Sequence, residues 1–212
     1  MIKDKWDSGV GYCQNLLDLQ AAIVPEQLQI TTAMSKIYQL KITLKDVKPP
    51  VWRRLEVPAD IKLDELGEII LEAMDWGGYH LTCFKFFGEE YYGERESALD
   101  LEGELMSKTK LSKCLKGEGQ KGLYTYDFGD DWRHEVLLEK ILVAEKGVSY
   151  PRCTAGKRAC PPDDCGGPWG YADFLKAIKD PKHPEHKAML EWIGGKFDAE
   201  EFGVEGVNEG LS

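Results

Sequence analysis

Tyr38-Gln-Leu-Lys-Ile-Thr-Leu44 is the stretch that decides the fold, because apolar and polar side chains alternate along it without interruption. A period of two is typical of a strand with one buried face and one solvated face. After a turn that ends in two prolines, Val51 begins a second apolar stretch, which we expect to be another strand. Arg53 lies within it, and a cationic side chain there needs an acidic or carbonyl partner, or an edge position.

The pattern becomes helical after residue 62. Leu63, Leu66 and Ile70 recur at helical spacing while acidic residues occupy the opposite face, and two glycines at 77 and 78 end the segment. Residues 81–87 predict a third strand. Because strand, strand, helix, strand is the order of a β-grasp core, we expect an α+β fold with a β-grasp-like core.

A hairpin is expected next, because residues 123–128 and 132–142 flank the turn Gly129-Asp-Asp131. On its second arm Trp132 and His134 share a face. A loop rich in Cys, Pro and Gly follows. Two helices come after it, one near residues 171–179 and one between Pro184 and Gly194. We expect these helices to form a cap at the carboxy-terminal end.

The domain organisation follows from these patterns. Residues 1–36 carry little periodicity, so we expect an N-terminal extension of which residues 1–34 are dispensable for folding. Residues 37–212 predict a single domain, divided into the core at 37–145 and the loop and helical cap at 146–212.

Composition limits where the protein works and what it binds. No apolar run approaches the roughly 20 residues needed to cross a bilayer, and no secretory signal is visible at the amino terminus, so we expect a cytoplasmic protein without a membrane partner. The net charge of −10 over 212 residues disfavours general nucleic-acid binding, which depends on clustered cations. A protein or small-molecule partner is the expectation.

Three of the six cysteines lie within thirteen residues, at Cys153, Cys160 and Cys165. In a chain of this size without a secretory signal, clustered cysteines indicate either a metal site or reduced structural thiols. With His134 as a fourth ligand they would form a closed Cys3His zinc site, which is structural rather than catalytic. The spacing matches no tight zinc knuckle, so packed thiols are the favoured alternative.

Acidic residues form a second constellation, around the hairpin turn and the cysteine loop. Paired carboxylates near a histidine can bind Mg²⁺ or act as general acid and base, but aspartate is also favoured in turns because it bonds the local backbone. We predict no catalytic residue. The predicted binding cleft comprises Asp127, Asp130, Asp131, Trp132, Asp163, Asp164, Trp169, His80 and Arg53.

Separate motifs follow one another in a fixed order along the chain. They are Tyr38-Gln-Leu-Lys-Ile-Thr-Leu44 with Pro50-Val-Trp-Arg-Arg54, then Tyr126-Asp-Phe-Gly-Asp-Asp-Trp-Arg-His134, then Ala155-Gly-Lys-Arg-Ala-Cys-Pro-Pro-Asp-Asp-Cys-Gly-Gly167, Gly170-Tyr-Ala-Asp-Phe174 and Pro181-Lys-His-Pro-Glu-His186. This order resembles the plasmid pRiA4b ORF-3-like family from residue 37 onward. The resemblance implies a compact α+β domain, and the family description adds a similarity to transposon resolvases.

Three functions are compatible with these observations. The favoured one is a non-enzymatic binding or interaction module, with a site formed by residues 126–134 and the Cys153–Cys165 loop. The first alternative is a metal-dependent, hydrolase-type enzyme that uses the Asp, His and Cys side chains of the cleft. The second is a DNA-binding protein associated with mobile elements, which would need a basic face formed by Lys48, Arg53 and Arg54.

Overall fold

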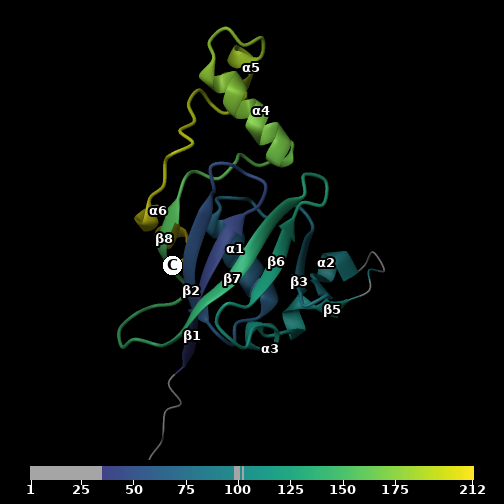
Figure 1. Ribbon diagram of the computed structural model, residues 1–212, viewed down its shortest axis with the longest axis vertical. Coiled ribbons are helices and arrows are strands. Elements are labelled where there is room, and N and C mark those ends of the chain that lie inside the picture. Colours follow the sequence, from purple (N-terminus) through teal and green to yellow (C-terminus); the bar gives the residue numbers. More distant parts are fainter. Residues whose placement is uncertain (1–34, 98–100, 102) are drawn as a thin grey trace, which may run out of the picture. The chain divides into compact units, whose positions relative to one another are not determined.

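The structure is a computed structural model that describes residues 35–97, 101 and 103–212. The expectation about residues 1–34 therefore lies outside the described residues. Within the described part, eight strands form one sheet and helices accompany it, so the fold is α+β (Figure 1). The strands are β1 (Lys36–Leu44), β2 (Trp52–Pro58), β3 (Thr82–Phe86), β4 (Glu89–Tyr92), β5 (Glu104–Leu105), β6 (Lys121–Tyr126), β7 (Trp132–Val143) and β8 (Arg152–Lys157).

The sheet has the order β5-β4-β3-β6-β7-β1-β2-β8. β1 pairs antiparallel with β2 on one side and with β7 on the other. The alternation seen in its sequence is present in the structure, since every second residue from Tyr38 to Leu44 is buried. Strand, strand, helix, strand does follow along the chain, but the hairpin β6–β7 lies between β3 and β1. The β-grasp-like description is not confirmed by this order.

The helix that follows β2, α1 (Leu63–Ala73), packs on one face of the sheet (Figure 1). α1 buries its apolar stripe, including Leu66 and Ile70. A Cβ added at Gly67 would lie 3.4 Å from the Tyr124 hydroxyl and 3.7 Å from the Phe84 ring, so the helix approaches β3 and β6 closely. The shorter helices are α2 (Glu94–Ser97), α3 (Leu111–Cys114), α5 (His186–Trp192) and α6 (Val204–Gly210), with a 3-10 turn at Met106–Lys108.

Two elements of the carboxy-terminal part, like the short elements between residues 89 and 105, have no counterpart among the sequence predictions. The first part of the cysteine loop is a strand, β8, which pairs with β2 and places Cys153 opposite Leu55. The acidic tail forms α6, and its Asn208 side chain bonds both the backbone N–H and the carbonyl of Cys153, at 2.7 and 3.0 Å. Both elements depend on partners distant in sequence, so local periodicity does not reveal them.

The expected carboxy-terminal helices are present. α4 (Gly167–Lys179) begins after Gly166, and Gly166 and Gly167 both have positive φ. α4 packs against α5 through Phe174 and Trp192, whose ring centroids lie 5.7 Å apart. α5 begins at His186, two residues later than Pro184 suggested. Among the described helices, none has the length and apolar character that a membrane crossing requires.

Candidate functional site at the junction of hairpin and cysteine loop

Three segments meet at one end of the sheet. They are residues 76–82 between α1 and β3, the β6–β7 turn at residues 127–131, and the loop at residues 160–166, and we call this meeting point the junction. Hydrogen bonds tie the loop to the other two segments: Trp76 Nε1 donates to the Pro161 carbonyl at 2.8 Å, and Tyr126 Oη donates to Asp163 Oδ2 at 3.1 Å. The predicted proximity of hairpin and cysteine loop is thus present here.

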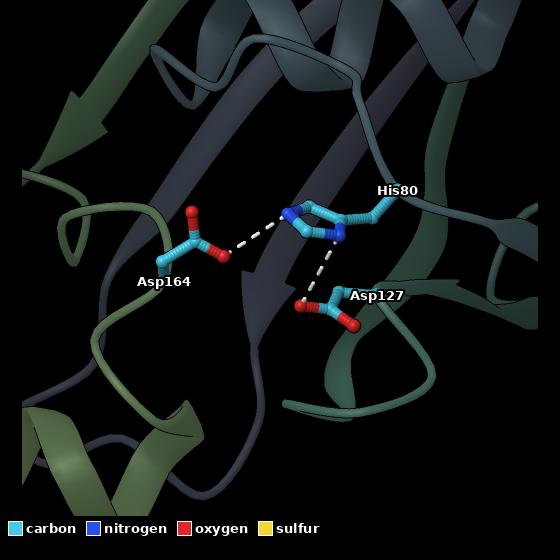
Figure 2. A group of neighbouring side chains, drawn as sticks. All are labelled: His80, Asp127 and Asp164. Atoms are coloured by element: carbon cyan, nitrogen blue, oxygen red, sulfur yellow. Dashed lines mark ion pairs between the residues drawn. The ribbon is translucent and has the colours of Figure 1, made fainter.

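His80 lies at the centre of the junction, between two carboxylates (Figure 2). Its Nε2 is 3.2 Å from Asp164 Oδ1, and its Nδ1 is 3.7 Å from Asp127 Oδ2. The side chains differ in exposure, at 32% for His80, 14% for Asp127 and 73% for Asp164. The group is therefore anchored on the Asp127 side and open to solvent on the Asp164 side.

Asp127 serves the turn and the group together. Its backbone has φ 56, and its Oδ1 accepts a hydrogen bond from the Gly129 N–H at 2.8 Å. Aspartate tolerates this left-handed conformation and commonly bonds the backbone two residues ahead. The second oxygen, Oδ2, remains available to His80. The turn chemistry therefore fixes the carboxylate in place for its contact with the imidazole.

Aromatic rings pack against the group formed by His80, Asp127 and Asp164. Tyr126 stacks on Trp76 with centroids 5.3 Å apart, and His80 meets the Tyr126 ring edge-on at 5.5 Å. Burial raises the pKa of Tyr126 to about 12, so its hydroxyl keeps its proton and donates to Asp163. Tyr126 thereby orients both the imidazole and the loop that carries Asp164.

The remaining aspartates of the predicted cleft have separate roles. Asp130 Oδ2 accepts from the Gly166 N–H at 3.0 Å, which ties the hairpin turn to the start of α4. Asp131 pairs with Arg133 at 3.2 Å on the surface. Asp163 Oδ1 is buried and has no hydrogen-bond partner among the described residues. Of these aspartates, Asp130 and Asp163 hold the junction together.

Trp132, Trp169 and Arg53 lie apart from the group. Trp132 is fully buried in the core, whereas Trp169 is 83% exposed in the first turn of α4. Arg53 is buried and donates from Nε to the Ala73 carbonyl at the end of α1, at 2.8 Å, and from Nη2 to Cys160 Sγ at 3.1 Å. A cation at the carboxyl end of a helix is favourable. The partner that the buried Arg53 requires is therefore the Ala73 carbonyl.

The predicted zinc set is not assembled in this structure. Cys153 lies on β8, Cys160 contacts Arg53 and Met74 Sδ, and Cys165 lies before α4. Among the described residues, no three of Cys153, Cys160, Cys165 and His134 bring ligand atoms within 4.8 Å of one another. Burial raises the pKa of Cys160 and of Cys165 to about 12, which disfavours the thiolate form that binds metals. This geometry supports the packed-thiol alternative.

His134 belongs to the core. Its Nδ1 lies 3.2 Å from the Tyr124 carbonyl, which can only accept, so Nδ1 carries the proton. Its ring packs edge-on against Trp76, with centroids 5.3 Å apart. Burial lowers the pKa of His134 to about 4, so the ring is neutral at pH 7. Trp76 contacts both His134 and the Pro161 carbonyl, and so connects the histidine to the cysteine loop.

His80, Asp127 and Asp164 form a donor set that could hold a metal ion. Within the described ranges this is the one group of three or more such side chains whose ligand atoms all lie within 4.8 Å of one another. Ligands bound at about 2.1 Å to a tetrahedral ion lie about 3.4 Å apart, so ligand atoms that now lie within 4.8 Å of one another would draw together by at most about 1.4 Å. One imidazole nitrogen and two carboxylates suit a divalent ion such as Zn²⁺ or Mn²⁺.

Sequence reasoning named these three residues among nine cleft members but did not group them. The contacts that hold the junction, Trp76 to Pro161 and Tyr126 to Asp163, were not predicted. An indole or phenol that reaches a polar partner leaves no periodic signal, since both rings also fill the core. The signal that was available is the concentration of His and Asp in two segments rich in turn residues.

Comparisons with known proteins agree on one relationship. The family model described as Plasmid pRiA4b ORF-3-like protein matches residues 36–206. The uncharacterized protein y4hQ of Sinorhizobium fredii (strain NBRC 101917 / NGR234) is 36% identical over 168 residues, which cover 76% of this chain and 82% of y4hQ. The crystal structure of MM3350 from Methanosarcina mazei Go1, a protein of unknown function, is similar with a TM-score of 0.75 and 40% identity. That match covers 81% of this chain and 97% of MM3350.

Proposed function

This chain belongs to the plasmid pRiA4b ORF-3-like family, and we propose that it is a binding module whose site is the junction and whose ligand there is a divalent metal ion. The observation that carries the proposal is that one ring nitrogen of His80 and one carboxylate oxygen each of Asp127 and Asp164 all lie within 4.8 Å of one another. A β-grasp-like core beneath this module stays part of the proposal, supported by the strand, strand, helix, strand order of β1, β2, α1 and β3.

The surroundings of the group favour binding over a purely structural role. Trp76 and Tyr126 already attach the loop to the core by hydrogen bonds, so the contact between His80 and Asp164 is not needed to hold the loop in place. His80 and Asp164 remain partly exposed, so an ion from solvent can reach them. Asp127 and Tyr126 fix the inner side of the site, and such support of the ligands raises metal affinity.

A metal-dependent hydrolase is the second candidate, and one feature favours it. Three protein ligands leave at least one coordination position open, as in catalytic metal sites, and the exposed Asp164 marks the open side. A bound divalent ion would supply Lewis acidity to a water or a substrate oxygen. Asp163 Oδ1, in the loop that carries Asp164, is the one buried carboxylate oxygen without a hydrogen-bond partner among the described residues. Hydrolysis of p-nitrophenyl phosphate or p-nitrophenyl acetate that disappears in Asp127→Asn would favour this candidate.

Nucleic acid is the least favoured partner. The junction gathers carboxylates, which repel phosphates. The basic face that DNA binding would require is reduced, because Arg53 is buried and Arg54 forms an ion pair with Glu139. A protein or small-molecule partner that meets the metal through a carboxylate, imidazole or hydroxyl group is the class we propose.

The test is a calorimetric titration of metal-stripped protein with Zn²⁺. We expect one ion per chain for the native protein, and affinity at least tenfold weaker in Asp164→Asn and in His80→Gln, since each removes a ligand. Asp164 is exposed, so its substitution leaves folding intact. Asp173→Asn is the matched control, because Asp173 lies on α4 and pairs with Lys176.

A second control separates the junction from the thiols. Cys160→Ser should keep the zinc affinity of the native protein and lower stability by only about 1 kcal/mol, as a packed thiol would. Zinc affinity that falls in Cys160→Ser but not in Asp164→Asn would contradict the proposal and restore the cysteine site.

A further inference from the structure

A second polar site adjoins the junction on the other side of His80. A cavity of about 210 Å³ lies between α1, the start of β3, α2 and β6. His80 and Thr82 form one wall, Leu71 and Met106 supply apolar surface, and Glu96 and Tyr124 contribute polar groups. Glu96 and Tyr124 define this second site, and neither belongs to the metal site proposed at the junction.

Glu96 is a buried acid with no cationic partner among the described residues. It is 3% exposed, and its Oε1 accepts the Thr82 N–H at 2.7 Å. Within the described part of the chain, no lysine, arginine or histidine nitrogen pairs with it, and the neighbouring Arg95 donates instead to the Tyr79 carbonyl. Buried carboxylates are costly unless a cation or several donors satisfy them. The Thr82 hydroxyl lies 3.5 Å from the same oxygen, so Glu96 presents at the cavity a buried carboxylate that only neutral groups of the described residues contact.

Tyr124 presents a second unsatisfied group. Its side chain is fully buried, and its hydroxyl has no hydrogen-bond partner among the described residues. The hydroxyl points toward Gly67 of α1, since a Cβ added at Gly67 would lie 3.4 Å from it, and Gly67 lines the same cavity. Buried polar groups without partners are uncommon in native proteins and call for an explanation. A ligand in the cavity would supply the missing contact.

Charge and size define the ligand. The acids Asp64 and Glu68 line the cavity together with Glu96, against one guanidinium, that of Arg95, so the balance of charge favours a cation over an anion. An alkylammonium group has three donors and no acceptor, which matches the acceptor oxygens of Glu96 and Tyr124. An apolar cavity of about 150 Å³ holds a benzene molecule, so about 210 Å³ accommodates a short alkyl chain as well. We propose that this cavity binds a small primary amine in its protonated form.

The test uses three probes of one shape and different charge. Amide resonances of the protein are followed by NMR during titration with n-butylamine, n-butanol and n-butyrate at pH 7, where the amine is protonated. We expect saturable shifts at Thr82, Gly93 and Glu96 with n-butylamine, and at least tenfold weaker effects with the other two. No saturation with n-butylamine, or equal binding of n-butanol, would overturn the proposal.

Variants locate the site and separate it from the metal. Glu96→Gln should weaken n-butylamine at least tenfold and Tyr124→Phe several-fold, because each removes one acceptor while keeping the shape. Glu89→Gln, an exposed acid on β4, is the matched control. If Glu96→Gln fails to fold, Tyr124→Phe provides the test. An unchanged affinity of Tyr124→Phe for n-butylamine would refute the site. Asp164→Asn should bind the amine normally even though it impairs zinc, so the two proposals fail independently.

Discussion

Two regions that each contain part of the motif at residues 126–134 differ in what their histidines do. The aromatic cluster of Trp76, Trp132 and His134 lies in the core, whereas the junction places His80 between carboxylates at the surface. Burial holds His134 neutral by lowering its pKa to about 4. Trp132 and His134 of the motif at 126–134 thus serve stability, while Tyr126 and Asp127 of the same motif support the candidate site. A string dense in Asp, Trp and His is not by itself one site.

The largest expected effect comes from the residue that belongs to both regions. Trp76 stacks on Tyr126, packs against His134 and donates to Pro161. Trp76→Ala should lower the free energy of unfolding by about 3–5 kcal/mol, because it leaves a large cavity and detaches the loop. Guanidinium unfolding followed by circular dichroism measures this change.

Trp169→Ala is the control, since Trp169 is 83% exposed and should change stability by no more than about 0.5 kcal/mol. Equal effects of the two substitutions would remove the distinction between the aromatic cluster and the surface.

The contact between turn and helix gives the next effect. Gly167 has φ 69, and a Cβ added there would lie 2.4 Å from the Asp130 carbonyl oxygen. Gly167→Ala should therefore cost about 2–4 kcal/mol, the sum of a left-handed alanine and a backbone clash. Gly194→Ala shares the positive φ, but its added Cβ meets no atom of the described residues within 4 Å, so it isolates the conformational part. Hydrogen exchange of the α4 amides should accelerate only in Gly167→Ala.

The neutrality of His134 predicts a pH dependence. Because its folded pKa is about 4 and its unfolded pKa about 6.5, the unfolded state binds more protons between these values. Stability should thus be full above about pH 6.5 and decline as pH falls, by about 2 kcal/mol at pH 5. In His134→Leu this loss should be absent. Parallel stability profiles of the two proteins between pH 5 and pH 7.5 would show that His134 is not the titrating group.

The smallest effect concerns the amino terminus. The family match begins at residue 36, and β1 begins at Lys36. Removal of residues 1–34 should shift the melting temperature by no more than a few degrees, as for termini that carry few core contacts. A large drop in melting temperature or in Zn²⁺ affinity would make this segment part of the folded unit.

Elements that depend on local sequence patterns could be predicted, whereas elements held by residues distant in sequence could not. The alternation in β1 and the turn at Gly129 are local, and both elements are present in the structure. β8 is held by β2 and by Asn208, about 100 and 55 positions away, so no local pattern predicted it.

The candidate site shows the same limit. Cysteine spacing suggested a metal set, but spacing does not fix direction: Cys153 is buried on a strand, and Cys160 contacts Arg53. His80, Asp127 and Asp164 were named as cleft members because of their residue types. Their grouping depends on the docking of the loop by Trp76 and Tyr126, which only the folded chain reveals.

Anomalous diffraction from a zinc-soaked crystal tests the central claim most directly. The account predicts a zinc peak at the junction, within bonding distance of His80, Asp127 and Asp164, and no peak at the cysteines. The same soak of an Asp164→Asn crystal should lose that peak. A peak at Cys160 or Cys165 with none beside His80 would contradict the account.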